Sequence, residues 1–143
     1  MLDYEWGKVA FERFPDLIDR FDFVDSPYAL WIELRLAFED AYKNPRNQDL
    51  IARIYDYANW CCSQPEGKTA EDDLGTCVCA CFYEDIPTIP EALEDMPQWF
   101  SLDDVLLMKQ TFSYMVGEEG FQRILLAYQR SSKCRKKENR KTR

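Results

Sequence analysis

The stretch from Asn47 to Cys62, NQDLIARIYDYANWCC, decides the fold class. Its apolar side chains recur at spacings of three and four residues, which places them along one face of an α-helix. The Asn47 side chain can accept a hydrogen bond from a backbone N–H group of the first turn and so begin this helix. The stretch therefore predicts an amphipathic helix whose apolar face packs against other helices.

The same helical period extends outward from this stretch over most of the chain. The predicted helices cover residues 4–14, 16–23, 27–43, 48–62, 74–83, 91–96, 102–116 and 118–130. Ser26 and Ser101 stand at N-cap positions, and Gly117 suits a left-handed conformation after a helix. The apolar run 74–83 could also form a strand, but no other segment offers a strand to pair with it. We predict an all-α fold, a single irregular bundle of about seven or eight helices packed as antiparallel hairpins.

Charge divides the chain into two parts. Residues 130–143 contain eight basic residues and one acidic residue, which leaves 25 acidic and 10 basic residues in 1–129, a net charge of −15. A body this acidic repels nucleic acid and anionic membranes and favours a basic protein partner. The segment after it lacks large apolar side chains. We predict a helical domain over residues 1–130 and a disordered basic tail over 131–143, whose binding to nucleic acid stays open.

Composition also excludes several kinds of enzyme. The chain has no histidine, which removes Ser-His-Asp and Cys-His catalysis, and its five glycines are too scattered for a phosphate-binding loop. We predict no catalytic residues, no metal site, no cofactor and no enzymatic activity. The first residues, MLDYEWGKVAFERF, carry acids where a secretory signal carries bases, and no apolar run approaches the roughly 18 residues of a membrane span. We expect a cytoplasmic protein that does not bind membranes.

Cysteine is the residue type of this chain that is best suited to react or to bind a metal. The six cysteines are Cys61, Cys62, Cys77, Cys79, Cys81 and Cys134. None of them forms the C-x-x-C spacing of zinc sites, and on a helix Cys79 points away from Cys77 and Cys81. We interpret the first five as small buried side chains, reduced and free of metal. The alternative is a thiol or metal-binding protein that uses Cys61, Cys62, Cys77 and Cys81.

The stretch FYEDIPTIPEALEDMPQWF, residues 82–100, combines aromatic, acidic and proline residues. Aromatic side chains anchor many protein interfaces, and acids around them suit a basic partner. The predicted partner-binding residues are Glu84, Asp85, Glu94, Asp95 and Trp99. In the alternative interpretation, the large apolar side chains of this stretch, Trp99 among them, close the end of the core.

Three segments carry a family resemblance: DLIARIYDYANWC (49–61), CFYEDIP (81–87) and DMPQWF (95–100). They resemble an uncharacterised bacterial all-helical family, a domain of unknown function, over residues 28–128. In that family aliphatic or small residues often stand at the positions of Cys77, Cys79 and Cys81, which implies packing rather than metal binding. The acidic helical composition is also similar to that of bacterial immunity proteins, which neutralise basic toxins. We predict a non-enzymatic protein-interaction module with an acidic surface, immunity-like or regulatory.

Overall fold

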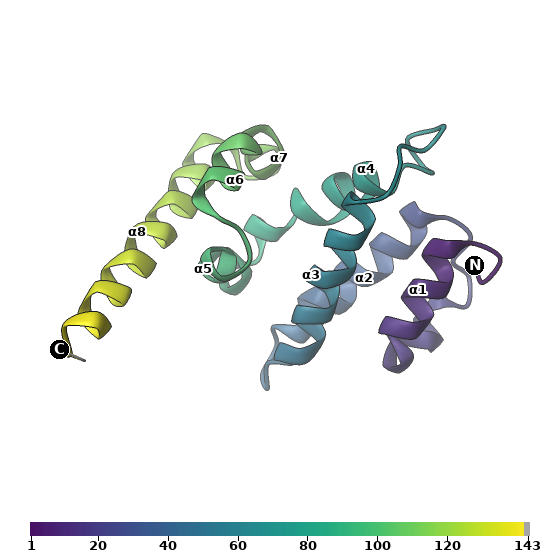
Figure 1. The fold of residues 1–143 in the computed structure, drawn as a ribbon, viewed down its shortest axis with the longest axis horizontal. Coiled ribbons are helices and arrows are strands. Elements are labelled where there is room, and N and C mark those ends of the chain that lie inside the picture. The colour runs from purple at the N-terminus through teal and green to yellow at the C-terminus, as the bar shows by residue number, and fades with distance from the viewer. Residues whose placement is uncertain (142–143) are drawn as a thin grey trace. The chain divides into compact units, whose positions relative to one another are not determined.

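The computed structural model describes residues 1–141, and within them it contains eight α-helices and no strand (Figure 1). The α-helices are α1 (Glu5–Arg13), α2 (Pro27–Ala41), α3 (Gln48–Cys62), α4 (Leu74–Val78), α5 (Pro90–Trp99), α6 (Leu102–Leu107), α7 (Lys109–Ser113) and α8 (Gly117–Lys141). Short 3₁₀ segments, η1 (Pro15–Phe21) and η3 (Ile86–Thr88), and one π-helical segment, η2 (Cys79–Tyr83), connect some of them. The predicted all-α class is confirmed.

The chain divides into two compact units, an N-terminal unit from Met1 to Phe82 and a C-terminal unit that begins at Tyr83. The sequence predicts one domain over residues 1–130.

In the N-terminal unit, two predicted N-cap residues make the hydrogen bonds expected of them. The Ser26 hydroxyl accepts from the N–H of Ala29 at 3.1 Å to begin α2, and the Asn47 side chain accepts from the N–H of Leu50 at 3.1 Å to begin α3.

An aromatic stack forms the centre of the N-terminal unit. The Trp31 ring on α2 stacks on Tyr57 of α3, with centroids 5.6 Å apart, and on Phe82 at 5.3 Å. Trp31, Tyr57 and Phe82 are almost completely buried. The Tyr57 hydroxyl donates to the backbone carbonyl of Trp6 in α1 at 2.8 Å. One cluster of side chains therefore joins α1, α2, α3 and η2.

Arg53 on α3 makes a second, polar connection in this unit. Its guanidinium donates to both carboxylate oxygens of Asp16 in η1, at 2.7 and 3.0 Å, and to the carbonyl of Arg13 at 2.9 Å. It also donates to Asp49, four residues earlier on α3, at 2.9 Å. The two-pronged bond to Asp16 matches the planar geometry of both groups and fixes the turn between α1 and η1 against α3.

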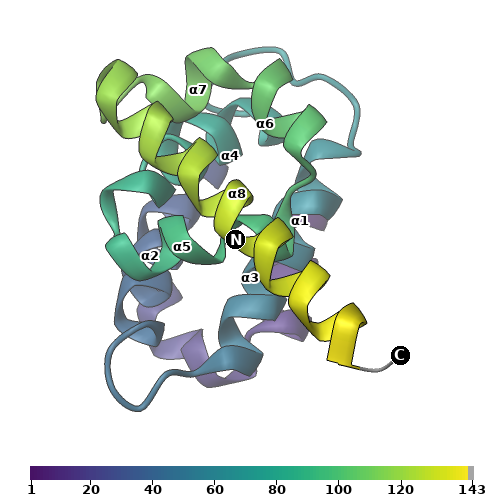
Figure 2. The same cartoon turned by 90° about the vertical axis from the view of Figure 1, so that its left-hand side faces the viewer.

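In the C-terminal unit, α5 packs on α8, and α7 packs on α8 after the chain turns through α6 (Figures 1 and 2). Phe112 on α7 is fully buried and meets Phe100 at 5.1 Å and Tyr83 at 6.0 Å between ring centroids. The Tyr128 hydroxyl on α8 lies within hydrogen-bond distance of the carbonyl oxygens of Met96, at 3.1 Å, and Phe100, at 2.8 Å. These contacts hold the end of α5 on α8.

Two helices of this unit end at other residues than the sequence predicts. Pro97 does not end α5, because in the last turn it removes a single backbone hydrogen bond and its fixed φ suits a helix. The predicted helix 102–116 is interrupted at Met108, where φ is −102° and ψ is 25°. The chain turns there, and Val105 and Phe112 are buried while Met115 is exposed. Gly117 has the predicted left-handed conformation, with φ at 69°.

The end of α8 differs from the predicted disordered tail over 131–143, because the helix continues to Lys141. Residues 121–141 contain no glycine or proline and are rich in lysine, arginine and glutamine, which are good helix formers. Every side chain from Ser132 to Lys141 is exposed. Residues 142 and 143 of the predicted tail lie outside the described residues. Among the helices that the structure describes, none is long and apolar enough to cross a bilayer.

The ion pair of Asp16 with Arg53 gives a testable pH dependence. The hydrogen bond from Arg53 holds the pKa of Asp16 below its usual value, so the pair stabilises the fold above the usual pKa and is lost as the pH falls through the lowered one. Both side chains are partly exposed. We therefore expect Asp16→Asn to lower the free energy of unfolding by only about 0.5–1 kcal/mol at pH 7, and by almost nothing near pH 2.

Urea unfolding at the two pH values measures this difference. Asp19→Asn, at an exposed aspartate of the same 3₁₀ segment, is the matched control and should leave stability almost unchanged at pH 7. An equal loss for Asp16→Asn at both pH values would show that its carboxylate charge is not what stabilises the turn.

Candidate functional site

The structure separates the cysteines that the sequence grouped together. Cys61, Cys77 and Cys81 are buried in the N-terminal unit, as expected. Cys79 is half-buried and Cys62 is exposed, so the prediction that all five are buried is wrong for Cys62. Adjacent residues diverge by about 100° on a helix, and the side of α3 that carries Cys61 faces the core. Cys134 lies on the exposed end of α8.

Burial suppresses the chemistry of two of the buried thiols. It raises the pKa of Cys61 to about 12 and, together with nearby negative charges, the pKa of Cys77 to about 12. A thiolate is the form that attacks electrophiles and binds metals, and both thiols are protonated near neutral pH, so they react slowly there. Within residues 1–141 no group of three or more cysteine, aspartate or glutamate side chains is placed to hold a metal ion.

The five predicted partner-binding residues all lie in the C-terminal unit, but in two places along its chain. Glu84 and Asp85 precede η3 and are half-buried. Burial, with a smaller contribution from the neighbouring Asp85, raises the pKa of Glu84 above its usual value. Glu94, Asp95 and Trp99 lie on α5.

On α5 the predicted acidic surface is partly neutralised. The exposed Glu94 carboxylate accepts from the guanidinium of Arg130 on α8 at 3.0 Å. A hollow beside it is lined by Arg123 as well as Glu94 and Arg130. Negative and positive side chains therefore lie together at this surface. Trp99 is half-buried rather than enclosed, whereas Ile86 and Ile89 of the same stretch are buried in the core. The alternative of a core-closing segment holds for the isoleucines and only in part for Trp99.

An exposed aromatic residue among acids does occur, in the N-terminal unit, where we did not predict it. Phe23 follows η1 and is 96% exposed, with Asp22 and Asp25 exposed on either side. Its neighbours Phe21 and Val24 are buried, and the N–H of Val24 donates to the carbonyl of Phe21 at 3.1 Å. The sequence does indicate the exposure of Phe23, because Leu17, Phe21 and Val24 recur at helical spacing and Phe23 does not lie on the face that they form.

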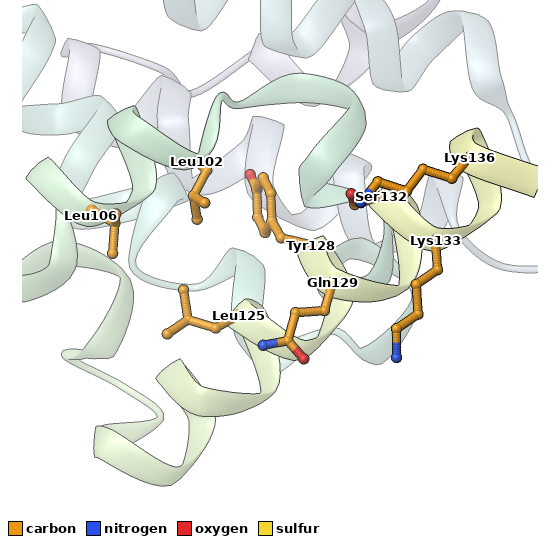
Figure 3. A pocket seen from close by; sticks show the side chains of 8 residues that line it. All are labelled: Leu102, Leu106, Leu125, Tyr128, Gln129, Ser132, Lys133 and Lys136. Atoms are coloured by element: carbon orange, nitrogen blue, oxygen red, sulfur yellow. The ribbon is translucent and has the colours of Figure 1, made fainter. Parts of the chain in front are cut away.

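A groove in the C-terminal unit is the second feature that the sequence did not indicate. It has a volume of about 560 Å³ and lies between α6 and α8. Leu102 and Leu106 on α6 face Leu125 on α8 at one end of it (Figure 3). Lys133 and Lys136 stand at the other end, more than one turn along α8. The groove is therefore apolar at one end and basic at the other.

Comparisons with known proteins do not extend these observations. No family model, no curated protein and no solved structure matches the chain. The resemblance to a bacterial domain of unknown function therefore stays a prediction.

The burial of the cysteines predicts their order of reaction. In the folded protein we expect Cys62 and Cys134 to react with iodoacetamide first, because both are exposed. Cys61, Cys77 and Cys81 should be protected at least about 100-fold, because reaction requires local opening and a thiolate. Mass spectrometry of peptides after timed alkylation at pH 7.5 measures the rates. If Cys77 reacted as fast as Cys62, the burial and the raised pKa described above would be contradicted.

Proposed function

We propose that this chain is a non-enzymatic protein-interaction module that binds a basic protein through an acidic surface, in the manner of an immunity or regulatory protein. The observation that carries the proposal is the exposed Phe23 between Asp22 and Asp25, on the more acidic of the two units. An exposed aromatic side chain in a fixed loop supplies an anchor, and the surrounding carboxylates select a basic partner.

Charge is unevenly shared between the units, in support of this proposal. The N-terminal unit has 16 acidic and 8 basic residues, a net charge of −8, whereas the rest of the chain has 10 of each. At least four of the eight basic residues of the N-terminal unit are engaged in ion pairs within it. These pairs join Arg20 and Lys43 to Asp40, Arg35 to Glu39, and Arg53 to Asp16 and Asp49. Its outward field is therefore dominated by the remaining carboxylates, which speed the approach of a basic partner.

Phe23 is held ready for contact before a partner arrives. Burial of Phe21 and Val24 fixes the loop on both sides of it, so little conformational freedom is lost when Phe23 enters a pocket of the partner. Exposure of 96% for an aromatic ring costs the isolated protein free energy that binding would recover.

The predicted surface formed by Glu84, Asp85, Glu94, Asp95 and Trp99 is kept as a second contact region in this proposal. Its charge is weaker than expected, because Arg130 pairs with Glu94. The thiol or metal-binding alternative is disfavoured by the raised pKa of Cys61 and Cys77. The proposal includes a cytoplasmic location, where a reducing environment keeps the cysteines as thiols.

The test is affinity capture from cells that contain the chain, followed by measurement of the captured protein's affinity for variants. Phe23→Ala should weaken binding by about 30-fold, the equivalent of about 2 kcal/mol for an anchor residue. Tyr114→Ala, at an aromatic residue of the other unit that is 72% exposed, is the matched control and should bind normally.

Charge reversal tests the electrostatic part. Asp22→Lys with Asp25→Lys should slow association at least about tenfold in low salt. Glu66→Lys with Glu71→Lys makes the same change of charge at exposed acids elsewhere in the unit and should slow it less. An acidic partner, or an affinity that ignores salt and Phe23→Ala, would contradict the proposal.

A further inference from the structure

The groove between α6 and α8 has the features of a docking site for a helix. On α8 its lining residues recur at Leu125, Tyr128, Lys133 and Lys136, which lie along one side of the helix over about three turns. Leu102 and Leu106, four residues apart, form one ridge of α6 beside it. Two helices side by side, with an apolar channel between them, present the surface on which amphipathic helices bind.

The groove is too open for a small ligand. Leu102 is 44% exposed and Leu106 49% exposed at its apolar end, whereas pockets for small molecules usually enclose most of the ligand surface. Along α8 the lining extends over residues 125–136, a length of about 17 Å. A partner helix of about 12 residues has the same length.

The charged residues of the groove determine which helix can bind and in which direction it lies. Lys133 and Lys136 stand at one end of the groove. Asp103 and Asp104 lie in the first turn of α6, and the charge of Asp104 adds to burial in raising the pKa of Tyr128, which lines the groove between its two ends. Acidic groups of a ligand are therefore attracted to the lysine end, whereas the leucine end offers apolar contacts only.

We propose that the groove between α6 and α8 binds an amphipathic helix of a partner protein, acidic in its first turn and apolar in its following turns. Acids are most favourable in the first turn of a helix because of its dipole. The first turn of the partner helix therefore lies against Lys133 and Lys136, and the helix runs antiparallel to α8. This surface differs from the one around Phe23 in unit, in charge and in partner.

The exposed end of α8 gives independent support. Every side chain from Ser132 to Lys141 is exposed, and most of the stability of a helix in a protein comes from the burial of one of its faces. A helix docked against Lys133 and Lys136 would cover one side of these turns. Binding is therefore coupled to stabilisation of the end of α8.

The experiment uses a fluorescent synthetic peptide of about 12 residues, held helical by a lactam bridge, with glutamates in its first turn and leucines at spacings of three and four. Fluorescence anisotropy with the full chain measures the dissociation constant. A peptide of the same composition with the glutamates in its last turn, and one with lysine for glutamate, should each bind at least about tenfold more weakly.

Variants of the full chain identify the site. Leu106→Asp should weaken binding of the first peptide at least about tenfold, whereas Leu107→Asp, at a neighbour that is 85% exposed and does not line the groove, should not. Lys133→Glu with Lys136→Glu should weaken it by a similar factor. The matched control, Arg123→Glu with Lys141→Glu, makes the same change of charge on another side of α8 and should weaken it less than about threefold.

Four results would overturn the proposal. They are equal effects of the two leucine variants, equal effects of the two charge variants, tighter binding to phosphatidylserine vesicles than to the peptide, and self-association of the chain that Leu106→Asp abolishes. The third result would assign the groove to a membrane surface, and the fourth to a second copy of the chain. In the supporting case, hydrogen exchange of residues 132–141 slows when the peptide binds.

Discussion

The stacking of the Trp31 ring on both Tyr57 and Phe82 is the interaction on which the N-terminal unit depends. It brings α2, α3 and η2 together in one stack, and the Tyr57 hydroxyl extends the connection to the backbone of α1. Phe82 also meets Phe38 and Tyr55, at 4.8 and 5.4 Å between centroids, so the aromatic cluster fills the centre of the unit. The Phe23 loop and the buried thiols are both held in place by elements packed around this core.

Most of the fold could be predicted because its determinants are local. Ser26, Asn47 and Ser101 each begin a helix by accepting a hydrogen bond from the backbone N–H group three residues later. Such a cap depends only on the residue type at one position, so it can be predicted from the sequence. The break at Met108 could not be predicted, because the helical spacing of 102–116 continues through it, and Phe112 packs against Phe100 and Tyr83 of other elements. The helical end of α8 was missed for another reason: a lack of apolar side chains indicates no packing, but does not prevent a helix of good helix formers.

The candidate surfaces were harder to predict than the fold, since exposure is set by tertiary structure. Acids that are close in sequence, such as Glu94 and Asp95, proved not to form a uniform acidic face, because Arg130 approaches from another helix. Phe23 could have been found from the helical spacing of Phe21 and Val24. The groove could not, because Leu106 and Leu125 belong to separate helices and meet only when these pack. We infer that the two units carry different interaction surfaces, one acidic with an aromatic anchor and one apolar with a basic end.

The most direct test of the central role of the Trp31 stack is a double-mutant cycle in urea unfolding, with Trp31→Leu, Phe82→Leu and the two combined. A buried aromatic pair contributes about 0.5–1.5 kcal/mol beyond the area that it buries, so the account predicts a coupling free energy in that range. The single variants should each lower the free energy of unfolding by about 2 kcal/mol or more, since both rings are buried. Additive effects of the two substitutions, within about 0.3 kcal/mol, would contradict the claim that this stack organises the unit.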